Sequence, residues 1–197
     1  IGELLKVDES EQAWEGAIER VMHNFGLSLL VADAHYQKVA HYVEKTHLKG
    51  RLVFFRIKDD AEERFDTPAE HSLFHKLRIK NDSVFYEWLA KEIAKRFDYY
   101  CADSLDEFRR QPKALSLQGQ VKSGASRHEK DDRYAINDRS RFILGWDNKA
   151  KIITLEQSLD VVQREGFNCL TQLGELDKQL KLLTRQRDKA RDLLNIE

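Results

Sequence analysis

Apolar residues recur at alternating spacings of three and four along the last quarter of the chain, from Ile152 to Leu194. This is the a and d pattern of a heptad repeat, in which one stripe of a long helix packs against a partner helix. A straight helix here would be roughly 70 Å long at 1.5 Å per residue. We therefore expect a coiled-coil arm over residues 149–197 that needs a partner strand. Its seam includes Ile152, Leu155, Leu159, Val162, Leu173, Leu176, Leu180 and Leu183.

The rest of the chain alternates between helical and strand patterns, and the same order of elements occurs twice. The predicted elements are helices at 10–23 and 33–45 with strands at 27–32 and 51–57, then helices at 83–97 and 103–110 with strands at 99–102 and 113–121. In both copies we expect an Asp, Asp33 or Asp103, to cap a helix directly after a buried strand. The sequence therefore predicts an α/β domain over residues 1–148, with halves at about 1–57 and 76–124.

Two polar segments separate these elements and carry opposite charge. Between Lys58 and His75 there are six acids and two bases, so residues 58–75 are predicted to be a solvated acidic linker. Residues 113–151 carry nine Lys and Arg against five acids, with a basic loop expected over residues 122–148. Because the whole chain has a net charge of −1, only this local clustering favours a nucleic-acid partner.

The local sequence is similar to the hinge domain of SMC-type proteins. GELLKVDE, AWEGAIERVM, LSLLVAD and KGRLVFFRI resemble the first half of such hinges, and ALSLQGQVKSGASR resembles the glycine-bearing strand and turn of the second half. The stretch RHEKDDRYAINDRSRFILGWDNKAKI looks most like the SMC-like, MukB-like subunit of bacterial Wadjet plasmid-defence condensins. The resemblance implies an α/β, SMC hinge-like domain of two related halves, followed by a long coiled-coil helix.

The resemblance also implies a function. The chain would be the hinge or dimerisation module of a cytoplasmic, nucleoid-associated ATPase that organises DNA, in plasmid restriction or chromosome organisation. It would form a homodimer through the hinge, with Gly119 and Gly124 at the interface. An antiparallel strand preceding Ile1 would pair with the arm, and other condensin subunits would bind the heads elsewhere in the protein. The chain begins at Ile1 and ends within a heptad, so we expect a piece of a longer protein with no catalysis and no cofactor of its own.

The basic segment is the strongest candidate for a binding site. Tyr134 and Phe142 lie among its cations and could stack on unpaired bases, while the cations contact phosphates. Intramolecular salt bridges with the neighbouring acids are the alternative. The candidate DNA-binding residues are Lys122, Arg127, Lys130, Arg133, Arg139 and Arg141.

Other chemistry is not supported. The stretch GQVKSGAS from Gly119 is a near match to a phosphate-binding loop, but Ala125 replaces the essential Lys. His71 and His75 lie one helical turn apart without a third metal ligand near them in sequence. No apolar run approaches 18 residues, so we expect no membrane contact.

Two other functions remain open at this stage. The main alternative is a DNA-binding or adaptor module with a coiled-coil stalk, unrelated to SMC proteins. The other is a small metal-dependent enzyme that would use His128, Glu129, Asp131 and Asp132. These four residues lie in a loop where alternating charges pair readily with each other, so the prediction is that no metal is bound.

Overall fold

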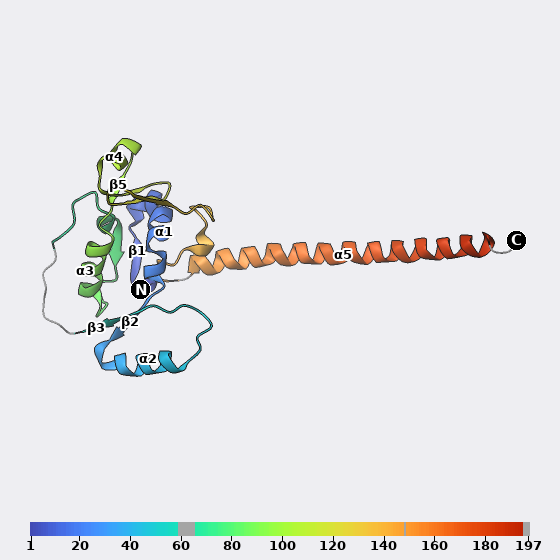
Figure 1. The fold of residues 1–197 in the computed structure, drawn as a ribbon, viewed down its shortest axis with the longest axis horizontal. Helices are drawn as coiled ribbons and strands as arrows, with labels where there is room; N and C mark the ends of the chain where they lie inside the picture. Colours follow the sequence, from blue (N-terminus) through green and yellow to red (C-terminus); the bar gives the residue numbers. More distant parts are fainter. Residues whose placement is uncertain (59–65, 148, 195–197) are drawn as a thin grey trace. The chain divides into compact units, whose positions relative to one another are not determined.

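The computed structural model describes residues 1–58, 66–147 and 149–194. It divides into two compact units, Ile1–Asn148 and Lys149–Glu197 (Figure 1). The α-helices are α1 (Glu15–Gly26), α2 (Asp33–Lys45), α3 (Tyr86–Arg96), α4 (Leu105–Arg110) and α5 (Lys149–Leu194). The strands are β1 (Leu5–Val7), β2 (Leu29–Ala32), β3 (Phe54–Ile57), β4 (Leu77–Ile79), β5 (Tyr100–Ala102), β6 (Lys113–Ser116), β7 (Gln120–Ser123) and β8 (Arg127–Lys130). The 3-10 helices are η1 (Gly2–Leu4), η2 (Glu9–Trp14), η3 (Leu73–Lys76) and η4 (Arg139–Arg141).

The globular unit contains the same motif twice, which confirms the two related α/β halves expected from the sequence. In the first half α1 precedes β2, α2 and β3, and in the second half α3 precedes β5, α4 and β6. The strands that flank α2, β2 and β3, are parallel neighbours, and so are the strands that flank α4, β5 and β6. A helix crossover is the connection that parallel neighbours require.

The sheets of the two halves are completed differently. The sheet formed by β2 and β3 has only these two strands. In the second half β7 and β8 extend the sheet in antiparallel fashion, giving the order β5-β6-β7-β8. The predicted strand at 113–121 is therefore two strands with a turn at Gly119 between them. Strand β8 was not predicted, because its residues Arg, His, Glu and Lys are all exposed and show no apolar alternation.

The core lies between α1, α3 and the sheets. Ile18 and Met22 on α1 meet Leu89 and Ile93 on α3, and all four side chains are fully buried. Phe55 of β3 packs against Phe25 and Trp88, with ring centroids 5.7 and 5.2 Å apart. The regularly spaced apolar residues of α1 and α3 thus form one buried face on each helix, as the sequence predicted.

Two local predictions were wrong. Asp33 is the first residue of α2 rather than its cap, and its carboxylate accepts a hydrogen bond from Arg56. In α4 the cap is Ser104, whose hydroxyl accepts the Glu107 N–H at 3.2 Å, and not Asp103. A Ser three residues before an acid is the stronger capping signal, since the acid can reach back to the preceding backbone.

The end of the segment predicted to be a solvated linker belongs to the core. Ser72 and Leu73 are buried, and Ser72 forms a bridge with Tyr100 beside β5. Strand β4, which follows directly, pairs with β1. Residues 59–65 of the predicted linker lie outside the described residues.

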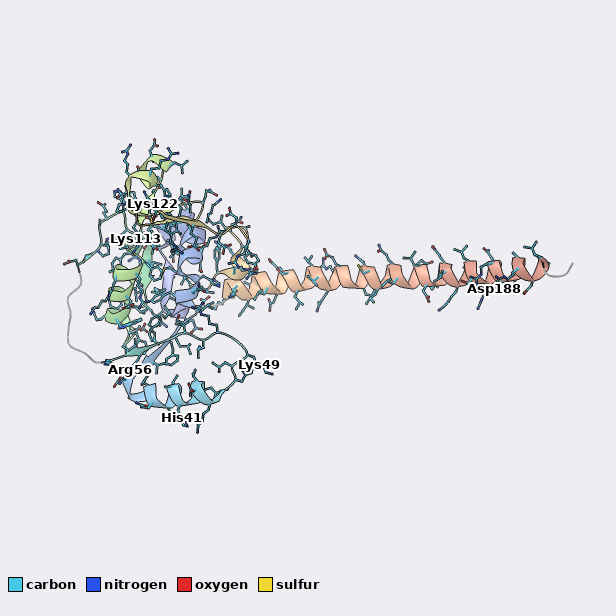
Figure 2. All side chains as sticks on the ribbon, viewed as in Figure 1. His41, Lys49, Arg56, Lys113, Lys122 and Asp188 are labelled. Atoms are coloured by element: carbon cyan, nitrogen blue, oxygen red, sulfur yellow. The ribbon has the colours of Figure 1, made fainter. Side chains whose placement is uncertain are left out.

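The second unit is the single helix α5, which runs through Gly166 without interruption. Figure 2 shows its side chains extending from the helix along its length, with Asp188 labelled near one end. None of the helices in the described ranges is both long enough and apolar enough to cross a bilayer.

Candidate functional site

The predicted DNA-binding residues are mostly engaged within the protein. Lys122 is buried and its Nζ donates to the Arg109 carbonyl oxygen at 2.7 Å, so it offers no charge to a partner (Figure 2). Arg127 pairs with Glu129 on β8, and Lys130 pairs with Asp132. Salt bridges within the segment, the alternative to a DNA contact, are therefore present.

The remaining three cations differ from one another. Arg133 makes two hydrogen bonds to Asp131, at 2.9 and 2.6 Å. Arg139 reaches α1, where its Nη2 lies 2.7 Å from a Glu15 carboxylate oxygen. Arg141 makes no ion pair within the part of the chain that the structure describes, and its guanidinium lies 3.4 Å from the centroid of the Tyr134 ring. Arg141 and Tyr134 are both exposed, so the pair offers a cation and an aromatic ring to solvent.

These pairs shift the pKa values of the acids. The hydrogen bond from Arg133 holds the pKa of Asp131 well below its usual value, and the same pair raises the pKa of Arg133. The hydrogen bond from Lys130 likewise lowers the pKa of Asp132. Both carboxylates are therefore charged at neutral pH and offset the basic charge of the segment.

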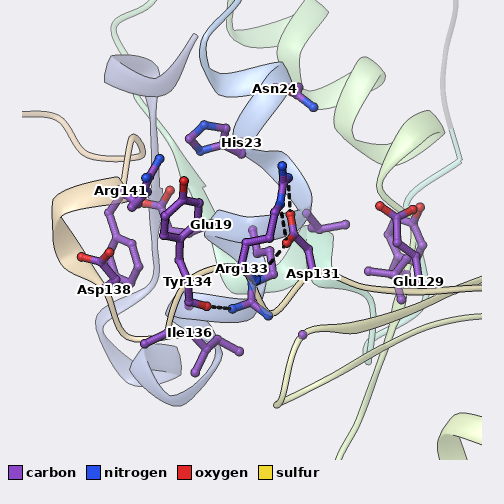
Figure 3. Close-up of a pocket in the computed structure, with 18 of the residues that line it drawn as sticks. Glu19, His23, Asn24, Glu129, Asp131, Arg133, Tyr134, Ile136, Asp138 and Arg141 are labelled. Atoms are coloured by element: carbon purple, nitrogen blue, oxygen red, sulfur yellow. Dashed lines mark hydrogen bonds and ion pairs between the residues drawn. The ribbon is translucent and has the colours of Figure 1, made fainter.

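A hollow of about 580 Å³ lies between α1, the β7–β8 hairpin and residues 131–142 (Figure 3). Its lining contains as many carboxylates as guanidinium groups. The acids are Glu19, Glu129, Asp131 and Asp138, and the guanidinium groups are those of Arg20, Arg127, Arg133 and Arg141. Because the acidic and basic groups are equal in number, and Arg127–Glu129 and Arg133–Asp131 are ion pairs, the hollow carries little net field toward a charged ligand.

The two glycines predicted at the dimer interface both have positive φ, 73° at Gly119 and 74° at Gly124. They differ in their surroundings. A Cβ on Gly119 would lie 3.1 Å from Arg20 Nη1 and 3.2 Å from Ile136 Cδ1, so this glycine is covered by its own chain. A Cβ on Gly124 would meet nothing within 4 Å. Only the turn at Gly124 is open to a partner.

The largest uncovered apolar side chains of the globular unit include several in the first half. Leu29 is 48% exposed although it stands in β2, and Leu27 and Leu52 beside it are exposed as well. The Leu29 N–H donates to the Val53 carbonyl, which places Leu52 next to the start of β2. We call Leu27, Leu29 and Leu52 the open patch.

The predicted coiled-coil seam is uncovered. Every seam residue named above is at least 47% exposed, from Leu155 at 47% to Val162 and Leu180 at 63%. A stripe of this kind on a 46-residue helix is stable in water only when a second helix covers it.

The histidines of the candidate metal sites make contacts within their own chain. No group of three potential metal ligands occurs among the described residues. His75 contacts the Pro68 carbonyl oxygen, and His71 stacks on Tyr100. The ring centroids of His128 and Phe108 lie 6.0 Å apart, so His128 contacts the aromatic residue that α4 buries.

The role of Glu19 was not predicted from the sequence. This residue lies on α1 among apolar neighbours and is only 4% exposed. Its two carboxylate oxygens accept the N–H groups of Ile143 and Leu144, each at 2.9 Å. The only available signal was the pair of helix glycines Gly16 and Gly26, since glycine inside a helix often marks a close approach.

No known protein-family model matches this sequence, and no curated protein matches it. Among solved structures, the chain is similar to the Pyrococcus furiosus Smc hinge domain with an extended coiled coil. The TM-score is 0.50 at 18% identity, over 94% of this chain and 70% of that one. A structure of the folded elbow of cohesin matches with a TM-score of 0.47 at 14% identity, over 95% of this chain and 28% of that one. The first likeness confirms the SMC hinge-like fold.

Proposed function

We propose that this chain is the hinge of an SMC-like protein and that its globular unit forms a homodimer. The observation that carries the proposal is the open patch on a hinge-like fold. A two-stranded sheet is marginally stable on its own, and β2–β3 leaves Leu27, Leu29 and Leu52 uncovered at one end. A second copy of the chain supplies the missing cover.

The geometry of β2 supports this role. Leu29 and Val31 point to the same face of the sheet, because alternate residues of a strand share a face. Val31 is buried, whereas Leu29 is not. Since β2 pairs with only one strand among those described, its second edge is available to another chain.

The test is the solution mass of the full chain after the seam has been broken. Leu159→Lys, Leu173→Lys and Leu180→Lys together place three charges on the stripe of α5 and remove coil pairing. We expect this variant to remain a dimer, because the globular unit carries the interface. A monomer would show that the exposed seam alone holds two chains together, which supports an adaptor with a coiled-coil stalk.

The parent protein is proposed to be a DNA-organising ATPase whose heads lie outside this sequence. The resemblance of residues 127–152 to Wadjet-type condensins supports a role in plasmid restriction, with chromosome organisation as the alternative. Plasmid retention in cells with and without the intact gene distinguishes the two. Loss of plasmid exclusion without a defect in chromosome segregation is the expected result.

A DNA contact is a second proposal, and Arg141 on Tyr134 favours it. This pair presents a cation and an aromatic face together, as proteins that bind single strands do. We expect Arg141→Ala to weaken binding of a labelled single-stranded oligonucleotide, measured by fluorescence anisotropy at low salt. Arg139→Ala is the matched control, because Arg139 is already paired with Glu15. Equal binding by both variants and the unmodified chain would contradict this contact.

A further inference from the structure

Residues 131–145, which we call the strap, are fastened to one face of α1. The chain leaves β8 and then contacts α1 at Gly16 and Gly26. Glu19 holds the strap near its end by accepting the Ile143 and Leu144 N–H groups, each at 2.9 Å. One buried carboxylate thereby satisfies two consecutive backbone donors more than 120 residues away in sequence.

Glycines on the same side bring the strap unusually close. A Cβ on Gly16 would lie 2.2 Å from the Ile136 carbonyl oxygen, and one on Gly26 would lie 2.4 Å from Ile143 Cδ1. A Cβ on Gly2 would lie 2.3 Å from the Ile143 carbonyl oxygen. Gly16 lies in the first turn of α1 and Gly26 is its last residue, and at both places a side chain would collide with the strap.

The strap is also retained where Ile136 and Leu144 pack against the core and where the Gly145 N–H donates to the Gly2 carbonyl oxygen at 3.1 Å. Its one regular element among the described residues is η4, and none of residues 131–145 is fully buried. Arg20 adds bonds to Asp132 and to the Tyr134 carbonyl oxygen, and Arg139 adds its ion pair with Glu15. Exposed ion pairs of this kind contribute little. Segments with few buried apolar contacts open locally before the core does.

We propose that the strap detaches from α1 and refastens as a unit, with Glu19 as its latch, and that detachment adds residues 131–145 to the connection that leads to α5. The strap is the covalent route from β8 to Lys149. This inference does not depend on whether the globular unit dimerises.

Glu19→Gln tests the latch with almost no change of shape. A carboxylate accepts with both oxygens, whereas an amide has one oxygen and would direct its NH₂ at the second backbone N–H. Losing one charge-assisted hydrogen bond increases the opening equilibrium roughly ten- to a hundredfold. In the full chain we expect hydrogen exchange at the Ile143 and Leu144 amides to accelerate by about that factor. Exchange at Ile93 and Leu115 in the core should be unchanged.

Two further variants separate latch loss from general destabilisation. Glu15→Gln removes the same charge from the same helix but at an exposed pair, so strap exchange should change little. Gly16→Ala should reproduce the Glu19→Gln pattern. Its new methyl group would collide with the backbone carbonyl oxygen of Ile136, which cannot move aside as a flexible side chain could, so the strap is displaced. Unchanged exchange at Ile143 and Leu144 in Glu19→Gln, or equal acceleration throughout the core, would overturn the proposal.

The effect on the arm is measured with a dye on Cys169, which is exposed, while Cys101 is buried. Burial raises the pKa of the Cys101 thiol to about 12, so Cys101 does not compete for the dye. We expect time-resolved anisotropy to show faster motion of α5 in Glu19→Gln than in Glu15→Gln. Identical decays in these two variants would contradict the coupling of the strap to the arm.

Discussion

The two halves of the globular unit share one motif but differ in how well it is covered. In the second half, α4 buries Phe108 at 2% exposure against Ala102 and Ala114. In the first half, α2 buries no residue at all, and Tyr42 on it is 62% exposed. Figure 2 shows His41 of α2 on its outer side, away from the rest of the unit.

The difference follows from what surrounds each helix. In the second half, β7 and β8 extend the sheet, and His128 of β8 contacts Phe108. In the first half the sheet stops at two strands, and α2 is tied to it near its first turn by Tyr36 and by the Asp33–Arg56 pair. The repeated motif is thus enclosed in the second half and left partly uncovered in the first.

The largest effect should come from comparing the loss of one aromatic side chain on α4 with the loss of one on α2. Phe108→Ala should lower the free energy of unfolding by about 3–5 kcal/mol, because it leaves a cavity in a closed cluster. Tyr42→Ala should change it by less than about 0.5 kcal/mol in the monomer, since the side chain is exposed. Urea denaturation at concentrations that favour monomers measures both. Equal losses would mean that α2 is packed as tightly as α4.

The dimer surface is tested by placing a charge on an exposed Leu in each half. Leu29→Glu should raise the dimer dissociation constant by about two orders of magnitude, because a charge would replace a central apolar contact. Leu105→Glu is the matched control, with Leu105 at 59% exposure on α4. Analytical ultracentrifugation measures the dimer dissociation constants of both variants. If Leu105→Glu dissociates the dimer and Leu29→Glu does not, the interface belongs to the second half.

Thiol reactivity compares how readily each half opens. Val31 and Cys101 occupy corresponding places in the repeated sequences LLVAD and YYCAD, and both are buried. With Cys169→Ser as background, the thiol introduced by Val31→Cys should react with a disulfide reagent at least about tenfold faster than Cys101, since the first half has less core around it. The pKa of about 12 at Cys101 also keeps its thiolate scarce at neutral pH. Equal rates would remove the distinction between the halves.

The smallest expected effect is on how the stability of the protein depends on acidic pH. The hydrogen bond from Arg56 lowers the pKa of Asp33 from its usual 3.8. Because the folded-state pKa is the lower one, this group contributes fully above the unfolded pKa and loses its contribution as the pH falls through the folded value. Asp33→Asn should therefore destabilise slightly at neutral pH and converge with the unmodified protein in strong acid. Asp106→Asn, whose contact with Arg109 is 3.4 Å long and local to α4, should show a smaller difference.

Much of the fold could be predicted because it depends on local periodicity. Apolar residues at helical spacing predict helices at 10–23 and 83–97. The structure has the 3-10 helix η2 followed by α1 at Glu15–Gly26 in the first of these regions, and α3 at Tyr86–Arg96 in the second. Helix α2 ends at Lys45 as predicted. The coiled-coil seam gave the position of α5 for the same reason.

The parts that could not be predicted depend on contacts between distant residues. Strand β8 exists because its backbone pairs with β7, although its side chains carry no strand pattern. Glu19 looks like an ordinary charged residue until Ile143 and Leu144 are placed against it. Lys122 was predicted to face DNA, yet the carbonyl of Arg109 at the end of α4 takes its ammonium group.

The central claim is that the globular unit dimerises through its incompletely covered first half. The most direct measurement is the mass of residues 1–148 by light scattering over a range of concentrations. We predict a dimer, converted to a monomer by Leu29→Glu. A unit that stays monomeric at every concentration, while the full chain is a dimer, would contradict the account and assign association to α5.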